Sequence, residues 1–342
     1  MLGGELLAGA RGFHALPPQL DPPFAETSSV QALRAAGGRY AVLGGMNLML
    51  PMPAGTLGLS ALHGAAPMVP RRAAELLACI EGPRHDPREP RVVAPLTDPA
   101  SLDHALLDLL DVRAVVFGDP ALHPALDPAL MGAAGVSAGD ATVEGSRPLL
   151  FAHPDEGLAA WSRPGAGPFA FLCGGAEVVP AADARLAWLS RPDAPIHATV
   201  LVERPLEHDL PVRGAMLPLE VGRATDDAMG LECEAPFAGV VVLAEAWDPG
   251  WSATLDGRPA PVLVVDHALL GLEVGPGRHQ IVFRYAPPGL RGAVVVSLAA
   301  LALLAVAALS AARVGSGRPL APETTDGRRD ALGPTGRRVC RG

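Results

Sequence analysis

The sequence predicts an α/β segment, then an all-β, sandwich-like domain, then a single C-terminal transmembrane helix. Three observations predict this fold class. Within residues 26–205, amphipathic stretches with helical spacing alternate with short apolar stretches, as in layered α/β folds. Within residues 206–290, short apolar stretches are separated by turns that contain glycine or proline, as in β-sandwiches. Residues 292–312 form an apolar stretch without a single charge.

Composition and charge exclude some classes of protein. The 342 residues are 49% hydrophobic and 18% charged, which is too apolar for a disordered chain. The net charge of −9 is unevenly distributed, because residues 1–312 carry −13 and residues 313–342 carry +4. An acidic body repels phosphate backbones, so we expect no nucleic-acid partner.

The α/β segment follows an N-terminal, proline-rich linker at residues 1–25. Helical spacing predicts helices at Ser28–Ala36, Pro70–Glu81, Ser101–Leu110 and Ala181–Leu189. Apolar stretches predict strands at Arg39–Leu43, Arg113–Phe117, Leu149–Ala152, Phe169–Leu172 and His197–Val202. We expect Thr27 or Ser28 to cap the first helix, since both carry a hydroxyl that can accept a backbone N–H.

The second part of the body has the signals of short, turn-connected strands. Strands are predicted at Val240–Ala246, Ser252–Leu255, Ala260–Val265, Leu269–Val274 and His279–Tyr285. The dipeptide Asp256-Gly257 predicts a hairpin turn, because both residues tolerate positive φ. Residues 275–277 predict a second turn, and residues 287–289 end the last strand.

The uncharged stretch predicts a membrane span, with the lipid bilayer as its partner. A helix over residues 292–312 is about 31 Å long, which matches the bilayer core. Arginines in residues 313–342 place this tail in the cytoplasm and the body outside the cytoplasmic membrane, by the positive-inside rule. Because the N-terminus lacks the features of a signal peptide, two readings stay open. Either further spans belong to the protein, or the chain is tail-anchored with a cytosolic body.

Several segments resemble the C-terminal end of YfhO-like bacterial membrane proteins. They are Trp247-Asp248-Pro249-Gly250-Trp251, Leu255-Asp256-Gly257-Arg258-Pro259-Ala260-Pro261, Gly275-Pro276-Gly277-Arg278-His279 and Phe283-Arg284-Tyr285-Ala286-Pro287, followed by the membrane helix. Weaker similarity extends upstream to about residue 26, through residues 107–116 and 182–189. Two positions, Ala114 and Ala246, depart from the pattern, which has an aromatic residue there.

The resemblance implies a role in glycosylating cell-surface polymers from polyprenyl-phosphate-linked sugars, at the cytoplasmic membrane of a bacterium. The family's long multi-span N-terminal part has no counterpart in this sequence. Neither does the acidic loop residue that related GT-C-type glycosyltransferases use. We therefore expect no catalytic residue in this chain, and a companion multi-span membrane chain is an implied partner.

Four residues are candidates for sugar contact. Trp247 and Trp251 could stack on pyranose rings, while Asp248 and Asp256 could accept hydrogen bonds from sugar hydroxyls. The competing interpretation is structural. Tryptophans beside a Pro-Gly corner are often core residues, and an aspartate before glycine is often a turn residue. The alternative function is a tail-anchored module that binds carbohydrate or a protein.

The remaining motifs predict no cofactor or metal site. The sequence has no P-loop and no dinucleotide fingerprint, and Ser137 in a G-x-S-x-G match lacks the flanking strand and helix of a nucleophile elbow. Four histidines adjacent to acids are expected at the surface: His85, His104, His208 and His267. The cysteines Cys79, Cys173, Cys233 and Cys340 lack metal-ligand spacing, so they are either core thiols or include one disulfide.

Overall fold

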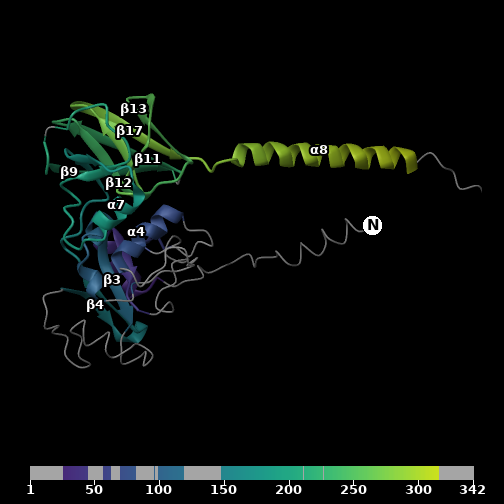
Figure 1. The fold of residues 1–342 in the computed structure, drawn as a ribbon. Coiled ribbons are helices and arrows are strands. Elements are labelled where there is room, and N and C mark those ends of the chain that lie inside the picture. The colour runs from purple at the N-terminus through teal and green to yellow at the C-terminus, as the bar shows by residue number, and fades with distance from the viewer. Residues whose placement is uncertain are drawn as a thin grey trace, which may run out of the picture. The chain divides into compact units, whose positions relative to one another are not determined.

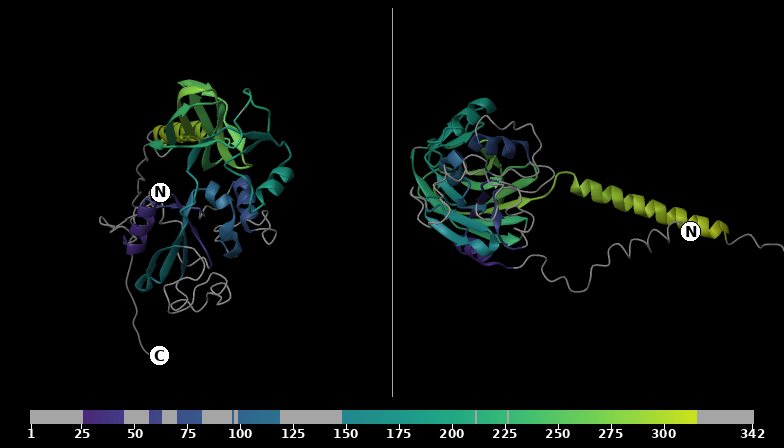
Figure 2. Two further views of the ribbon diagram at one scale, coloured as in Figure 1. Left: turned by 90° about the vertical axis from the view of Figure 1, so that its left-hand side faces the viewer. Right: turned by 90° about the horizontal axis from the view of Figure 1, so that it is seen from below.

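The computed structural model describes residues 26–44, 57–62, 70–81, 96, 99–118, 148–210, 212–225 and 227–315. The chain divides into two compact units, Met1–Ala286 and Pro287–Gly342. Figures 1 and 2 show their elements as ribbons. The first unit contains all of the described strands and every described helix except one.

The N-terminal sheet has five strands in the order β2-β1-β3-β5-β4. They are β1 (Arg39–Val42), β2 (Ser60–Ala61), β3 (Val112–Gly118), β4 (Leu149–His153) and β5 (Leu158–Ser162). Strand β1 is parallel to β2 and β3, whereas β5 is antiparallel to β3 and β4. Helix α2 (Ser28–Ala36) packs Val30 and Leu33 against one face of this sheet. The Thr27 hydroxyl accepts the Val30 N–H, so the expected N-cap is confirmed.

The second sheet has seven strands in the order β7-β8-β15-β16-β12-β6-β9. They are β6 (Ala170–Cys173), β7 (Ala176–Val178), β8 (Val200–Val202), β9 (Met216–Leu219), β12 (Gly239–Ala246), β15 (Leu263–Val265) and β16 (Leu269–Val274). Strand β12 is buried on both faces. Val240 and Val242 pack on the helical side, and Val241 and Leu243 pack on the opposite side. This two-sided burial explains why β12 is a continuous apolar stretch without alternation.

The third sheet is antiparallel, with five strands in the order β10-β11-β17-β13-β14. They are β10 (Val221–Thr225), β11 (Ala228–Ala235), β13 (Trp251–Leu255), β14 (Arg258–Ala260) and β17 (Gly277–Tyr285). Its inner face carries Leu231, Ile281 and Phe283, which share one core with Leu172 and Val241 of the second sheet. The second and third sheets therefore form the predicted β-sandwich.

Short helices cover the other face of the second sheet. They are α4 (Arg71–Glu81), α5 (Leu106–Leu109) and α7 (Ala182–Leu189), with the 3₁₀ helix η2 (Pro99–Asp103) shortly before α5. A second 3₁₀ helix, η3 (Pro154–Glu156), connects β4 and β5. Helices α4 and α7 lie side by side, as Figure 1 shows. Leu76 and Leu189 from these helices, Phe117 of the first sheet and Phe171 of the second belong to one core cluster. The helices thus join the first sheet to the sandwich.

The second unit contains helix α8 (Leu290–Gly315). Its segment Gly292–Ser310 has 19 residues with a mean hydropathy of 2.6, and none of it is buried in the protein. At 1.5 Å per residue this segment is about 29 Å long, the thickness of a bilayer core. Within the described part of the chain, α8 is the one helix long and apolar enough to cross a membrane.

The predicted fold class is confirmed: an α/β start, a sandwich-like body and one apolar C-terminal helix. Two predicted elements are interrupted. The helix expected at 101–110 is split into η2 and α5, because the His104 ring nitrogen Nδ1 accepts the Leu106 N–H. The strand expected at 260–265 is split around Pro261, with β14 in the third sheet and β15 in the second. Proline lacks the N–H that a continuous strand would use.

The turn at residues 275–277 connects different sheets. Strand β16 before it belongs to the second sheet and β17 after it to the third, so the chain crosses the sandwich there. Strands β2, β5, β7, β9, β10 and β11 were not predicted. Strands on both sides of the expected domain boundary at 205/206 pair within the second sheet, and that boundary stays a prediction.

Candidate carbohydrate-contact site

The corner between β12 and β13 holds three of the four predicted sugar-contact residues. Trp247 follows β12, and its N–H donates to the Ala268 carbonyl at 2.7 Å. Asp248 Oδ1 accepts the Gly250 N–H at 2.8 Å, which closes a tight turn. Trp251 then begins β13. The structure therefore places Trp247, Asp248 and Trp251 within one turn at the end of the sandwich.

Tyr285 completes this corner. Its ring centroid lies 5.2 Å from that of Trp251, at an interplanar angle of 53°. Burial raises the pKa of Tyr285, and the neighbouring Asp248 carboxylate, hydrogen-bonded to its side chain, raises that pKa further. A partly exposed pair of aromatic rings beside a carboxylate offers an apolar face and a hydrogen-bond acceptor together. Pyranose rings present the complementary combination of C–H faces and hydroxyls.

Trp247 is engaged by the protein itself. The Arg72 guanidinium lies over its ring, 5.4 Å from the centroid, in a cation–π arrangement. The indole also packs against the sandwich core. One face of Trp247 is thus covered by Arg72, whereas Trp251 and Tyr285 form the aromatic pair of the corner.

Asp256 lies at the opposite end of β13. Asp256 (φ 53°) and Gly257 (φ 77°) form the predicted hairpin turn between β13 and β14. Asp256 Oδ1 accepts the Gln280 N–H at 2.8 Å, and Oδ2 lies 2.9 Å from His279 Nδ1. These two donors lower the pKa of Asp256. Strand β13 separates Asp256 from Trp251 by about 17 Å, so the structure does not bring the four residues into one site.

Asp256 instead lines a separate groove of about 540 Å³. Its lining comes from the loop at residues 204–208, from the β13–β14 hairpin with residues 259–261, and from Glu273 and Gly275. Leu263 and Leu272 contribute to its apolar lining, and Arg204 and Arg258 contribute charge. This volume lies in the range of small-ligand sites. Sequence reasoning missed Arg204, and the resemblance covered Arg258 without assigning it a role.

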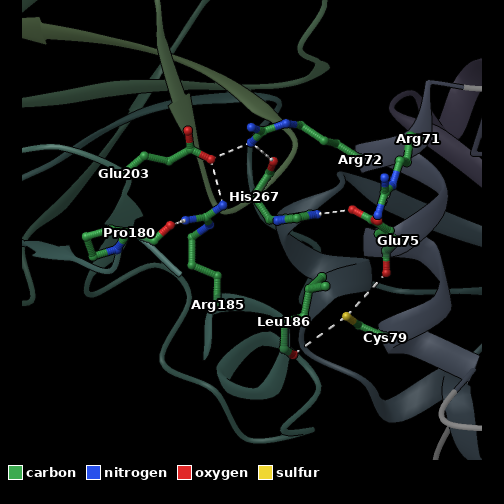
Figure 3. A network of polar contacts seen from close by, with 9 residues as sticks. All are labelled: Arg71, Arg72, Glu75, Cys79, Pro180, Arg185, Leu186, Glu203 and His267. Atoms are coloured by element: carbon green, nitrogen blue, oxygen red, sulfur yellow. Dashed lines mark hydrogen bonds and ion pairs between the residues drawn. The ribbon is translucent and has the colours of Figure 1, made fainter. Parts of the chain in front are cut away.

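A partly buried network of charges lies where the helices meet the second sheet (Figure 3). Glu203 Oε1 accepts a hydrogen bond from Arg185 at 2.6 Å and another from Arg72. Arg185, only 2% exposed, also donates to the carbonyls of Val179 and Pro180. This network holds Arg72, and therefore the ring that Arg72 covers, in place.

The turn between β15 and β16 completes the network. Asp266 and His267 both have positive φ, at 46° and 71°, and both are buried. Asp266 Oδ1 accepts the Leu201 N–H at 2.9 Å, and burial raises the pKa of Asp266 to about 7. His267 Nε2 lies 2.7 Å from Glu75 Oε2. Burial lowers the pKa of His267, and Glu75 partly offsets this effect.

The structure corrects the prediction that the histidines next to acidic residues lie at the surface. His104 and His267 were expected at the surface, but they are 5% and 2% exposed, respectively. The prediction failed because burial depends on tertiary packing, which adjacent residues do not reveal. His208 is exposed, as expected, and pairs with Glu273. His85 lies outside the described residues, as do Ser137 and Cys340.

Cys79, Cys173 and Cys233 are buried free thiols. Burial raises the pKa of all three, and that of Cys173 reaches about 11. Among the described residues, no group of three or more histidine, cysteine or acidic side chains is placed to hold a metal ion.

The fold and the corner define a membrane-anchored, β-rich module. Residues 238–297 match the family described as "Bacterial membrane protein YfhO". The match runs from the start of β12 to the first turns of α8 and contains all four predicted sugar-contact residues. The C-terminal part of the chain is therefore YfhO-like. No curated protein and no solved structure shows significant similarity to the chain.

Proposed function

We propose that this chain is the extracytoplasmic C-terminal part of a YfhO-like membrane protein that glycosylates cell-surface polymers from polyprenyl-phosphate-linked sugars. The body holds a saccharide segment of the acceptor polymer, while a multi-span membrane partner carries out the transfer. The observation that carries this proposal is the family match at residues 238–297, because it contains the corner, the hairpin and the start of the membrane helix.

The chemistry of the corner supports saccharide contact. Trp251 and Tyr285 form an aromatic pair whose rings are half-buried and thus held firmly. The Asp248 carboxylate is oriented by the Gly250 N–H and lies beside Tyr285. Rigid aromatic groups cost little conformational entropy when they bind a ligand.

Substitutions at Trp251 test this role in the bacterium that produces the protein. We expect Trp251→Ala to lower surface-polymer glycosylation about tenfold, through loss of ring stacking, and Trp251→Phe to retain most of it. The measurement is mass spectrometry of the polymer, with the amount of protein in the membrane determined in parallel. The neighbouring, exposed Ser252→Ala is the matched control. Normal glycosylation by Trp251→Ala at normal protein level would contradict the proposal.

Topology separates the proposal from its alternative, a tail-anchored binding module with a cytosolic body. Ser252→Cys introduces an exposed thiol into the body, whose described native thiols are buried. A membrane-impermeant maleimide added to intact spheroplasts should label this variant and leave the wild-type chain, with Cys340 in its tail, unlabelled. Labelling of the wild-type chain at Cys340, with no gain from Ser252→Cys, would establish the inverted topology and favour the alternative.

A further inference from the structure

Two arginines that line the groove, Arg204 and Arg258, make no hydrogen bond or ion pair through their guanidinium groups within the described part of the chain. Most arginines whose side chains the structure describes in the first unit donate to a carboxylate or a carbonyl. The exceptions, without a hydrogen bond or ion pair from the guanidinium, are Arg204, Arg213, Arg258 and Arg284. Arg204 and Arg258 line the same groove, Arg204 from the loop at residues 204–208 and Arg258 from the β13–β14 hairpin. A guanidinium has five N–H donors, so Arg204 and Arg258 present donors that no group among the described residues satisfies.

Three acidic side chains line the groove, those of Glu207, Asp256 and Glu273, and two of them are engaged by other groups. Asp256 accepts hydrogen bonds from Gln280 and His279. Glu273 accepts the N–H groups of Glu207 and His208 at 3.0 and 2.5 Å, and its Oε1 lies 2.8 Å from His208 Nδ1. The Asp256 charge acts on Arg258 through space, but no ion pair joins them. The carboxylates thus stabilise the groove walls, while the two guanidiniums stay available for a ligand.

Prolines and leucines make up much of the rest of the groove lining. Pro205, Pro259 and Pro261 fix the backbone φ at their positions, and Leu255, Leu263 and Leu272 contribute apolar surface. A ligand that fits therefore has a compact body with apolar faces and an anionic group that reaches the rim. The planar fork of arginine matches the oxygens of a carboxylate or a phosphate.

We propose that the groove between residues 204–208 and the β13–β14 hairpin binds an acidic saccharide, with Arg204 and Arg258 as the residues that recognise its carboxylate or phosphate. This inference rests on the proposed function, because it names the charge class of the saccharide that the body holds. It assigns Asp256 the role of fixing the hairpin that presents Arg258, in place of direct sugar contact.

Binding of defined oligosaccharides to the full chain in detergent tests the inference. The probes are a tetramer of galacturonic acid, its carboxyl-reduced form, and a neutral tetramer that carries one phosphate monoester. We expect the carboxyl-reduced form to bind at least about tenfold more weakly than the acid, since it cannot accept charge-assisted hydrogen bonds. The carboxylate and phosphate probes distinguish the two sources of anionic oxygen. Equal affinity for the acid and reduced forms would overturn the inference, and so would failure of both anionic probes to bind.

Substitutions of the two groove arginines test whether the anionic probes bind in the groove. Arg204→Gln with Arg258→Gln should abolish the preference for the anionic probes, whereas Arg258→Lys should retain part of it, because the charge stays and the planar fork is lost. Arg213→Gln removes an exposed arginine that lies outside the groove and is the matched control. Unchanged preference in the double variant would place any binding elsewhere. Hydrogen–deuterium exchange of the hairpin confirms that the variants keep their fold.

The result of the oligosaccharide-binding experiment can be distinguished from the result of the glycosylation experiment that tests the proposed function. A preference for acidic probes, together with normal polymer glycosylation by Trp251→Ala, would leave this inference intact and remove the glycosylation role. Loss of glycosylation in Trp251→Ala, together with equal binding of the acid and reduced probes, would support the glycosylation role and overturn the inference about the groove.

Discussion

The imidazole of His267 and the carboxylate of Glu75 lie 2.7 Å apart, although 192 positions separate them in the sequence. The contact joins the tight β15–β16 turn to helix α4. His267 is 2% exposed and Glu75 13% exposed, so water cannot replace either partner easily. The helical layer therefore stabilises a turn whose two residues have positive φ.

Removal of the Glu75 carboxylate should destabilise the body. Glu75→Ala leaves the His267 Nε2 without its partner in a buried site, which costs about 1–3 kcal/mol of unfolding free energy. Denaturant unfolding of the chain in detergent, followed by tryptophan fluorescence, measures this loss. The control is Arg71→Ala, whose side chain is 84% exposed and also pairs with Glu75. It should change stability by less than about 0.5 kcal/mol. Equal effects of the two variants would contradict the assignment.

Asp266 should make stability fall with rising pH. Burial raises its pKa to about 7 in the folded protein, whereas the unfolded chain has the ordinary value of 3.8. The folded state therefore holds an extra proton between these values, so the unfolding free energy decreases as pH rises from about 4 to 7. Asp266→Asn keeps the acceptor for the Leu201 N–H and suits positive φ, without the ionisation.

Unfolding free energies at pH 5 and pH 8 test this prediction. The stability advantage of the Asn variant over wild type should be larger at pH 8 than at pH 5, by about 1–3 kcal/mol. A stabilisation that is the same at both pH values would show that ionisation of Asp266 is not its cause.

Replacement by alanine should destabilise the sandwich at Gly271 but have little effect at Gly230. At Gly271, an added Cβ would overlap the Val265 side chain, so Gly271→Ala should cost about 1–3 kcal/mol through overpacking. At Gly230, the nearest atoms would lie 3.9 Å away, an ordinary contact. Gly230→Ala should therefore lie within about 1 kcal/mol of wild type. Thermal unfolding of both variants checks the contrast, and a similar loss at both positions would contradict the packing described for β16.

Helix α8 should be the membrane anchor. A stop codon at Leu290 removes the whole helix, whereas one at position 316 removes only the residues after it. Because about 29 Å of apolar helix is lost with the first truncation, that protein should be released from membranes by alkaline carbonate. The second truncation should stay in the pellet, like the full chain. Retention of both truncated proteins would mean that another segment anchors the body.

Local features of this protein could be predicted from its sequence. The Asp256-Gly257 hairpin depends on the φ preferences of two adjacent residues, and the Thr27 cap depends on a hydroxyl three residues before the N–H that it accepts. The same holds for the Trp247–Trp251 corner, which its Asp-Pro-Gly sequence predicts. Strand β11 was missed, although Met229, Leu231, Cys233 and Ala235 alternate toward the core. Two glutamates and a glycine between them weaken the apolar signal.

Sequence alone determined the apolar anchor, the all-β character of residues 206–290 and the residues of the corner, because each depends on neighbours a few positions apart. Tertiary structure decided the rest. The crossing from β16 to β17 separates strands that adjoin in sequence, and the second sheet joins strands from both halves of the body. The burial of His267 and Asp266 and the meeting of Arg204 with Arg258 across one groove likewise require distant segments to pack together. Such contacts follow from burial of apolar surface over the whole chain, which no short window of sequence contains.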